Sequence, residues 1–327
     1  MKKAIITGVK GQDGALLSKL MLSKGYTIYG CDLPGANERN LRYLDIDKSV
    51  QYIDVDLLDL SNVIRMIERY EPDEIYNLAA QSSVGLSFDQ PIGTIELNII
   101  SVANLLEAIK ILKVKTKFYQ ASSSEMFGNV RRENLPIKED HAFHPASPYG
   151  ISKAASHWLT VNYRESYHIF AVSGILFNHE SALRGRQFVT KKIINTAVKI
   201  SMGLADELYL GNMNIYRDWG YAPYYVEAMW LMLQQNDPSD YIICSGEAHS
   251  LQEYAEGVFS LLNIDFEKYV KIDKNLYRPM DMDIIYGNSD KARDKLKWHY
   301  NMKFAELISN LVAEERHLIE WEMRNQK

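Results

Sequence analysis

Two residues near the middle of the chain have types and a spacing that suit acid–base chemistry. Tyr149 and Lys153 stand four residues apart in the segment SPYGISK (147–153), which predicts the start of a helix. Residues four apart project from one face of a helix. An ammonium beside a phenol favours the phenolate, so we expect Lys153 to lower the pKa of Tyr149 from its usual value of about 10.

A second pair of polar residues, Ser123 and Glu125, follows the apolar stretch FYQA (118–121), which predicts a buried strand. If this strand ends beside the start of the helix, one pocket holds a hydroxyl donor, a carboxylate and an activated phenol. Each residue also has a purely structural interpretation, as a packing neighbour, a turn or a solvated side chain. The elements that position the four residues decide between the two interpretations.

The N-terminal segment predicts a phosphate-binding loop. A short apolar strand is followed by Gly8, Gly11 and Gly14, and then by a helix with an apolar stripe. Glycines let the backbone approach a pyrophosphate, and the helix N-terminus offers free N–H groups and a favourable dipole. Gln12 and Asp13 lie inside the same loop, so we expect all five residues to contact a dinucleotide.

The end of the second predicted strand (27–31) bears on which dinucleotide is bound. Asp32 stands there, about 20 residues after the glycine loop, where an acidic residue accepts hydrogen bonds from the ribose hydroxyls. A carboxylate at this place repels the extra phosphate of NADP, so the sequence favours NAD over NADP. The structural alternative is that Asp32 caps a turn beside Pro34 and Gly35.

Two further strand ends supply candidate cofactor contacts. The third strand (50–53) leads to Asp56 and Leu57, where a carboxylate can accept from an adenine amino group or cap the helix that begins near Asp59. The fourth strand (74–77) runs into small residues that would let the backbone pass close to an extended cofactor. These residues are Leu78, Ala79, Ala80, Gln81 and Ser82.

The alternation of strands and helices predicts an α/β fold of the Rossmann type, with a doubly wound parallel sheet. We expect residues 1–178 to form the NAD-binding domain, with a return strand near 240–245. Residues 179–327 are then a smaller, mixed and mainly substrate-binding domain. Ligands of such sheets lie at the C-terminal strand ends, where Ser82, Ser123 and Glu125 fall.

Composition excludes several classes of function. The net charge of −5 over 327 residues argues against general nucleic-acid binding. Two cysteines make no disulfide framework, and neither a metal-ligand cluster nor an apolar run long enough to span a membrane is present in the sequence. The N-terminus lacks the features of a secretion signal, so we expect a cytoplasmic protein. Basic residues scattered after position 181 indicate a second anion site or simply a solvated surface.

The motifs resemble those of a known family. The Gly8-x-x-Gly11-x-x-Gly14 loop together with Tyr149-x-x-x-Lys153 resembles the extended short-chain dehydrogenases, which act on nucleotide sugars. Longer blocks resemble the GDP-mannose 4,6-dehydratase family, and the resemblance covers nearly the whole chain. The blocks are 75–82, 118–125, 174–181, 217–220 and 225–230.

The resemblance implies a reaction in which a GDP-sugar loses water and becomes a 4-keto-6-deoxy sugar. Tyr149, helped by Lys153, would take the proton of the C4 hydroxyl while the C4 hydride passes to the nicotinamide. Glu125 would remove the C5 proton and assist loss of the C6 hydroxyl, and the hydride would return to C6. A carboxylate that acts first as base and then as acid is not needed by a simple epimerase or reductase.

The resemblance also implies roles for other residues. Ser123 stands where the family has threonine and would hydrogen-bond the C4 oxygen, Lys153 would also hold the nicotinamide ribose, and His179 and Arg184 match positions near the cofactor. The residues matched to the GDP-sugar side are Ser83, Asn178, Val189, Lys192, Asn212, Arg217, Arg278 and Asp281. The guanidinium groups among them suit a diphosphate.

The chain also departs from the family pattern. Family members carry arginines after the second strand and use NADP, whereas this chain has Asp32-Leu33-Pro34-Gly35, which favours NAD. The same loop contributes to the family's tetramer, so a homodimer and a homotetramer both remain open. The segment 217–224 differs from the family's usual pattern, which leaves mannose, N-acetylglucosamine and heptose as candidate sugars.

Two alternatives share parts of this pattern. A nucleotide-sugar C4 epimerase or 4-keto reductase would use the same Tyr149 and Lys153, and a non-catalytic nucleotide-sugar sensor could keep the fold alone. We also expect a partner subunit to contact the helices that carry Thr94 and Tyr149, because the first of them is apolar nearly all round.

Overall fold

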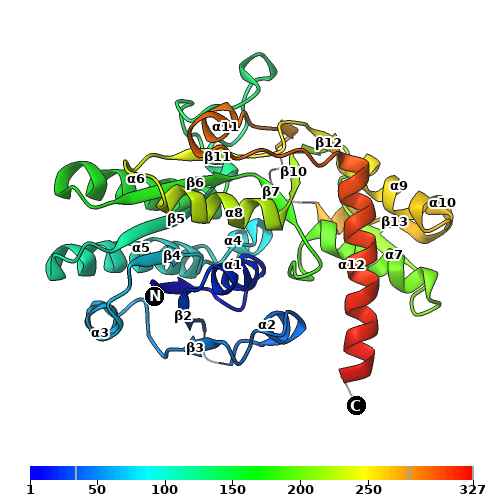
Figure 1. Ribbon diagram of the computed structural model, residues 1–327. Coiled ribbons are helices and arrows are strands. Elements are labelled where there is room, and N and C mark those ends of the chain that lie inside the picture. The colour runs from blue at the N-terminus through cyan, green and yellow to red at the C-terminus, as the bar shows by residue number, and fades with distance from the viewer. Residues whose placement is uncertain (34, 278–279, 281, 326–327) are drawn as a thin grey trace.

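The computed structural model of the protein describes residues 1–33, 35–277, 280 and 282–325 (Figure 1). Seven strands form one sheet in the order β11-β6-β5-β4-β1-β2-β3, and all neighbouring pairs in it are parallel. This order confirms the predicted Rossmann-type fold and places the return strand at the sheet edge. The strands are β1 (Lys3–Thr7), β2 (Thr27–Cys31), β3 (Val50–Tyr52), β4 (Glu74–Asn77), β5 (Lys117–Ser123), β6 (Ala171–Leu176) and β11 (Tyr241–Ile243).

Helices cover both faces of this sheet (Figure 1). They are α3 (Leu60–Tyr70), α5 (Pro91–Leu112) and α6 (Pro148–Tyr167) on one face, and α1 (Gln12–Ser23) and α8 (Ala222–Leu233) on the other. Because successive side chains of a strand point to opposite faces, Ile5 packs with α3 and α5 whereas Ile6 packs with α1 and α8. Because helices cover both faces of the sheet, its strands carry apolar side chains on both faces.

The helix that carries Tyr149 begins where the sequence predicted. The Ser147 hydroxyl accepts a hydrogen bond from the Gly150 N–H at 3.0 Å, and Pro148 occupies the first turn, where its missing N–H costs nothing. α5 begins at Pro91, three residues before the predicted Thr94, for the same reason. The remaining helices of this part are α2 (Arg39–Tyr43) and α4 (Val84–Asp89).

A second, smaller lobe follows β6. Its apolar core lies mainly between α7 (Val189–Ser201), α9 (Leu251–Leu261) and α12 (Phe304–Asn325). α10 (Phe266–Tyr269) and the 3₁₀ turn η3 (Lys274–Leu276) also belong to this lobe. The 3₁₀ turns η1 (Ser124–Met126) and η2 (Arg132–Asn134) lie between β5 and α6, and α11 (Asp290–Leu296) packs on the core of the large sheet. The short strands, mostly of this lobe, are β7 (Asn178–Glu180), β8 (Leu208–Leu210), β9 (Tyr216–Arg217), β10 (Trp219–Tyr221), β12 (His249–Ser250), β13 (Val270–Ile272) and β14 (Ile284–Ile285).

These short strands explain why the sequence pattern becomes irregular after residue 181. They pair in twos and threes, as β10-β7, β12-β9-β14 and β13-β8, and each has only two or three residues. Such strands are too short to show a period of two in the sequence. β7 leads directly out of the large sheet after β6, so the two lobes are joined by a paired strand.

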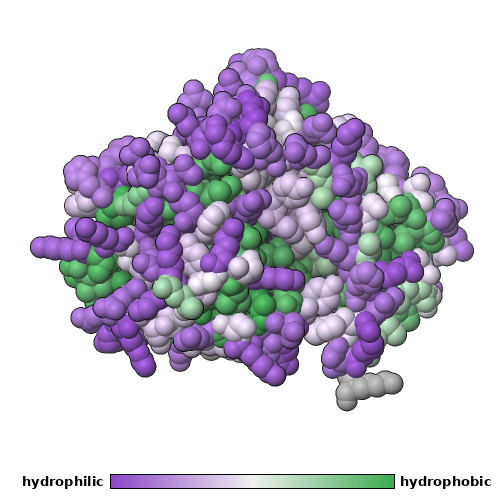
Figure 2. All heavy atoms as spheres, in the orientation of Figure 1, coloured by the Kyte–Doolittle hydropathy of each residue, from purple (hydrophilic) through white to green (hydrophobic). Residues whose placement is uncertain are grey.

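The face of the molecule seen in Figure 2 is largely hydrophilic, with smaller hydrophobic patches between the polar side chains. Within the described part of the chain, none of the helices combines the length and the apolar character that a membrane crossing needs. Cys31 and Cys244 are both buried and unpaired, in agreement with the absence of a disulfide framework.

Candidate active site

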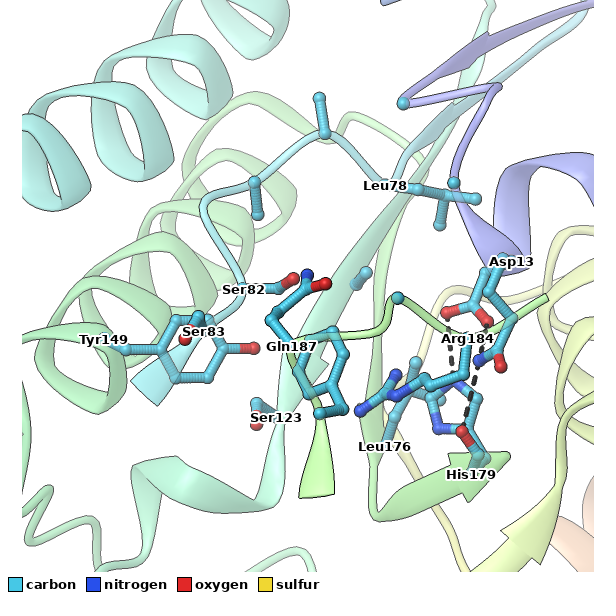
Figure 3. A pocket seen from close by; sticks show the side chains of 18 of the residues that line it. Asp13, Leu78, Ser82, Ser83, Ser123, Tyr149, Leu176, His179, Arg184 and Gln187 are labelled. Atoms are coloured by element: carbon cyan, nitrogen blue, oxygen red, sulfur yellow. Dashed lines mark hydrogen bonds and ion pairs between the residues drawn. The ribbon is translucent and has the colours of Figure 1, made fainter. Parts of the chain in front are cut away.

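A cavity of about 1030 Å³ lies between the C-terminal ends of the sheet strands and the second lobe. Its walls come from the glycine loop, the segments after β2, β3, β4 and β5, the first turns of α6, and the segment 176–190. Figure 3 shows Tyr149 and Ser123 on one side of this space and Asp13, His179 and Arg184 on the other. Parallel strands bring these residues to one place although they are far apart in the sequence.

The glycine loop forms a narrow cradle at the N-terminus of α1. Gly8 has φ of +68°, and a Cβ built on it would lie 3.0 Å from the Ala79 nitrogen. A Cβ on Gly14 would lie 2.3 Å from the Gly8 oxygen, so no side chain fits there. Gly8 and Gly11 line the cavity, while Gly14 does not line it and instead lets α1 pack on the loop. The loop therefore has the shape that a pyrophosphate needs.

Asp13 is tied to the second lobe by a part-buried contact with His179. Its Oδ2 lies 2.9 Å from His179 Nε2, while His179 Nδ1 lies 2.7 Å from the Phe177 carbonyl oxygen. Burial by itself would raise the pKa of the Asp13 carboxyl, but His179 and its hydrogen bonds hold that pKa below its usual value. Gln12 extends the contact by donating to the His179 carbonyl at 3.1 Å. The three residues fasten the glycine loop to the strand that enters the second lobe.

Asp32 lies at the end of β2 and lines the cavity, as predicted. Its two carboxylate oxygens accept from the N–H groups of Lys10 and Leu33, each at 2.9 Å. These bonds fix the carboxylate beside the glycine loop, on the wall of the cavity, so a contact between Asp32 and a ribose stays a prediction.

Most of the other predicted cofactor residues line the same cavity. Asp56 accepts from the Leu58 N–H at 2.9 Å, and the Thr7 hydroxyl accepts from the N–H groups of Leu78 and Ala79. Gln81 does not line the cavity, since its side chain bonds to Ser83 and Thr94. The predicted cofactor residues of these segments found in the walls are Asp56, Leu57, Leu78, Ala79, Ala80, Ser82, Lys153, His179 and Arg184.

The four candidate catalytic residues all line this cavity. Ser123 is the last residue of β5, and its hydroxyl accepts from the Glu125 N–H at 3.2 Å, which starts the turn η1. Tyr149 and Lys153 come from adjacent turns of α6 and are buried. The side chains of Tyr149 and Ser123 point toward the same space in Figure 3.

The electrostatics of Tyr149 differ from the sequence-based expectation. Burial raises its pKa to about 12, and the Glu125 carboxylate adds to the rise, while a hydrogen bond from Ser123 and the charge of Arg184 oppose it. Lys153 does not lower this pKa as predicted, because its ammonium lies 5.8 Å from the centre of the Tyr149 ring and donates to the Ala121 carbonyl at 2.8 Å. Burial also lowers the pKa of Lys153 to about 8, which weakens its charge.

The predicted substrate residues divide into three groups. Ser83, Asn178, Val189 and Arg217 line the cavity, and Arg217 Nη1 donates to the carbonyls of Tyr216 and Met282. Lys192 and Asn212 are not in the walls: Lys192 donates to the Tyr209 carbonyl at 2.6 Å, and the Asn212 side chain accepts from Asn214. Arg278 and Asp281 lie outside the described residues.

Sequence reasoning missed several wall residues. Lys10 lies inside the glycine motif but was not singled out, and Asn40 crosses from α2 to the carbonyls of Lys10 and Leu183. Glu180 is buried and lies 3.5 Å from Arg184, which also packs over the Phe188 ring. The position of Lys10 within the motif was an available signal, whereas the places of Asn40 and Glu180 depend on the approach of distant segments.

Comparison with protein families and comparison with individual sequences lead to the same group of enzymes. The family described as GDP-mannose 4,6 dehydratase matches residues 5–311. The chain is 43% identical over 329 residues to GDP-mannose 4,6 dehydratase 2 of Arabidopsis thaliana (97% of this chain, 87% of that protein) and 39% identical over 336 residues to GDP-mannose 4,6 dehydratase of Homo sapiens (94% and 90%).

Among solved structures, UDP-glucose 4-epimerase of Thermus thermophilus in complex with NAD is 26% identical, with a TM-score of 0.83 and coverage of 96% of this chain and 99% of that one. A dTDP-glucose 4,6-dehydratase of Bacillus anthracis in complex with NAD shares the fold, with a TM-score of 0.84 at 18% identity, covering 100% of this chain and 98% of that one.

Proposed function

This chain belongs to the GDP-mannose 4,6-dehydratase family, and from this premise we propose that it is a hydro-lyase that converts a GDP-sugar into its GDP-4-keto-6-deoxy derivative. The observation that carries the proposal is the convergence of Ser123, Glu125, Tyr149 and Lys153 on one cavity beside a glycine loop. A nicotinamide dinucleotide held in that loop would supply the chemistry of accepting a hydride from C4 of the sugar and returning it to C6.

The residues of the cavity fit such a dinucleotide. The crowded glycine cradle leaves backbone N–H groups of α1 for a pyrophosphate, the Asp32 carboxylate lies where it would accept hydrogen bonds from ribose hydroxyls, and the small residues after β4 leave room for a flat ring. Asp32 is the observation that supports NAD over NADP. The hydride that the dinucleotide accepts from C4 is returned to C6 in the same turnover. The dinucleotide therefore ends in its starting oxidation state, and the protein needs no second redox partner.

Tyr149 takes the proton of the C4 hydroxyl in this proposal. Its pKa of about 12 keeps its hydroxyl protonated near neutral pH in the isolated protein, and the Ser123 hydrogen bond and the charge of Arg184 are the contributions that favour its phenolate. Ser123 also stands close enough to Tyr149 to share a hydrogen bond with the C4 oxygen of the substrate. Lys153 positions its ammonium at the end of β5, where it would meet the nicotinamide ribose.

Glu125 distinguishes a dehydratase from related reactions. Once C4 is a ketone, the C5 proton is acidic, and a carboxylate can remove it and then protonate the departing C6 hydroxyl, which leaves as water. When the hydride returns to C6, C5 needs a proton, and the Tyr149 hydroxyl, protonated in the first step, would supply it. Glu125 lines the cavity beside Ser123, and its charge acts on Tyr149, so both residues face the same part of the space. A carboxylate at this place has no task in a simple C4 epimerisation.

We propose that residues 1–178 hold the dinucleotide and that residues 179–327 mainly hold the GDP-sugar. Val189 and Arg217 approach the cavity from the second lobe, and Asn178 lies at the boundary between the two parts. The positive charge of the Arg217 guanidinium suits a diphosphate. Mannose, N-acetylglucosamine and heptose are the candidate sugars, since the segment 217–224 departs from the family pattern on this side of the site.

In the decisive experiment, the protein is incubated with NAD and one GDP-sugar at a time. The three sugars tested are those of GDP-mannose, GDP-N-acetylglucosamine and GDP-heptose. Mass spectrometry should show loss of one water from at least one of them. Glu125→Gln should reduce this loss by at least about 100-fold, the usual size of a general acid–base contribution, while still yielding some 4-keto sugar that keeps its C6 hydroxyl. The exposed Glu133→Gln, outside the cavity, is the matched control and should behave as the wild type.

The competing functions give different outcomes. The similarity in fold to UDP-glucose 4-epimerases favours a C4 epimerase or 4-keto reductase as the second candidate. For an epimerase, Glu125→Gln would leave the rate of C4 inversion almost unchanged, and no sugar would lose water. If no sugar is altered at all, the protein acts as a nucleotide-sugar sensor and the dehydratase proposal is wrong.

We also propose that the protein forms a homodimer or homotetramer through α5 and α6. Large apolar side chains are exposed on these helices, with Ile92 at 74% and Trp158 at 58% of their full accessible surface. α5 and α6 pack against each other along their lengths, so the exposed side chains can form one patch that a second copy would cover. A cytoplasmic location is proposed as well, because both cysteines are free thiols.

A further inference from the structure

Lys10 is placed where it would influence the choice between NAD and NADP. It lies in the glycine loop, and its backbone N–H donates to Asp32 Oδ2 at 2.9 Å. The same loop and Asp32 line the end of the cavity formed by residues 31–58. Among the described wall residues of this end, Lys10 is the only lysine or arginine.

A cation at this position can affect the binding of NADP more than the binding of NAD. NADP differs from NAD by a phosphate on the ribose hydroxyl that Asp32 faces, and this phosphate carries a charge of about −1.5 to −2. Basic side chains near the ribose accommodate the phosphate, whereas an acidic residue repels it. Asp32 and Lys10 therefore act in opposite directions on the same group, and the preference depends on whether the Lys10 ammonium is available.

The ammonium of Lys10 is engaged on the wall of the cavity. Its Nζ donates to the Ala36 carbonyl at 3.0 Å, lies 3.6 Å from Glu38 Oε1, and sits 4.9 Å from the centre of the Tyr52 ring. The Lys10 side chain is only 14% exposed as a result. Glu38 is in turn held by Arg42 Nη2 at 3.3 Å, so the carboxylate has a fixed place at the start of α2.

We propose that Lys10 and Glu38 form a second determinant of dinucleotide choice, in which Glu38 holds the Lys10 ammonium beside Ala36 and keeps it from pairing with a 2′-phosphate. The inference rests on the proposed dinucleotide site but not on the identity of the sugar or on catalysis. Asp32 repels the phosphate directly, and Glu38 engages the Lys10 charge that would compensate for that repulsion.

The test compares dissociation constants of NAD and NADP, measured by calorimetric titration of nucleotide-free protein at low and at physiological ionic strength. The variants are Glu38→Gln, Lys10→Met and the combination of both. Glu68→Gln is the matched control, because Glu68 is an exposed glutamate on α3 and is not part of the cavity wall. A thermal melt of each variant shows that it is folded, and Glu38→Ala repeats the test with a different side chain.

For the wild type, NAD should bind more tightly than NADP. Glu38→Gln should lower the ratio of the NADP to the NAD dissociation constant at least fivefold, mostly through tighter NADP binding, and the change should shrink as salt is added. The double variant should lose this gain, because it lacks the ammonium. A ratio that stays within twofold of the wild type in both Glu38 variants, or a gain that persists in the double variant, overturns the inference.

The same titrations separate this inference from the proposed function. If neither dinucleotide binds the wild type, the proposed cofactor site is wrong. If both bind, and Glu38→Gln has no effect on their ratio, only the role of Lys10 and Glu38 is wrong.

Discussion

Burial determines the electrostatics of single residues in this cavity more strongly than their sequence neighbours do. Tyr149 and Lys153 stand four apart as expected, yet the pKa of the phenol rises and that of the ammonium falls, because both have left water. Arg184 and Ser123, which come from other elements, are the groups that favour the phenolate. The site is therefore an arrangement of mutually dependent charges, and in the proposed mechanism Tyr149 can act as a base only when its partners are in place.

At this scale, Lys153→Met should stabilise the protein while it abolishes activity. A lysine whose pKa is about 8 in the folded chain, against an ordinary value of 10.5, is penalised by burial at pH 7, where both states are charged. The difference between the two pKa values corresponds to at most about 3 kcal/mol of unfolding free energy, and about 1–3 kcal/mol is the expected gain. Urea denaturation at pH 7 measures it.

The pH dependence supplies the check on this explanation. Between pH 8 and about 10.5 the unfolded chain binds the Lys153 proton more strongly than the folded chain does, so the free energy of unfolding of the wild type rises with pH in this window. The difference between variant and wild type should therefore shrink from pH 8 to pH 10. A variant that is less stable than the wild type at pH 7, by an amount independent of pH, would contradict the argument.

At the scale of elements, the N-cap of α6 fixes the first turn of the helix, and this turn positions Tyr149. Ser147 caps the helix, Pro148 begins it, and Tyr149 follows at once, so the phenol of the proposed base stands only two residues from the cap. The Gly150 N–H that bonds to Ser147 belongs to the same turn. A small movement of this turn would shift the Tyr149 hydroxyl relative to Ser123 and Glu125, which come from a different element.

Ser147→Ala should therefore affect catalysis beyond its effect on stability. Loss of an N-cap side chain usually costs about 1 kcal/mol, and misplacement of Tyr149 should lower kcat by about tenfold, equivalent to about 1.4 kcal/mol in the barrier. Ser250→Ala is the control, since Ser250 caps α9 in the same way and does not line the cavity. Equal effects of the two substitutions on kcat would show that the cap has no special role in positioning Tyr149.

At the scale of the whole molecule, the C-terminal helix holds both rims of the cavity. Glu322 of α12 bonds to Arg39 at the start of α2 and to Arg186 in the segment 184–188. Nearer the start of α12, Glu315 pairs with the buried Lys191, which also donates to the Ala182 carbonyl. Figure 1 shows α12 running along the second lobe down to the level of α2. The helix α12 therefore contacts both lobes, and both lobes contribute walls to the cavity.

The outer face of α5 and α6 is the second feature of the whole molecule that can be tested. Light scattering should give at least twice the mass of one chain, and Ile100→Glu should shift the distribution toward monomer, because a charge would be buried in the apolar contact. Leu204→Glu is the control, as this leucine is also exposed but follows α7 in the other lobe. A wild-type monomer at tens of micromolar would refute the proposed contact.

Much of the fold and part of the site were accessible from the sequence. Hydrophobic periods and the glycine spacing predicted the strands β1, β2 and β4 to the residue, and the Ser-Pro pair predicted the start of α6, because these signals are local. The short strands of the second lobe were missed, since two or three residues carry no period. Lys192 and Asn212 were expected in the site but lie outside its walls, because resemblance gives a place in the chain and not the direction of a side chain.

The sequence by itself determined which residue types are present at the ends of the parallel strands, and with them the phosphate cradle, the acid after β2 and the Ser123, Glu125, Tyr149 and Lys153 set. Only the tertiary structure decided how these groups act on one another. Burial raised the pKa of Tyr149, the approach of the segment 179–190 brought Arg184 and His179 to the site, and the start of α2 placed Glu38 beside Lys10. Charge interactions and desolvation depend on distance and on exclusion of water, and both are set by segments that lie far apart in the sequence.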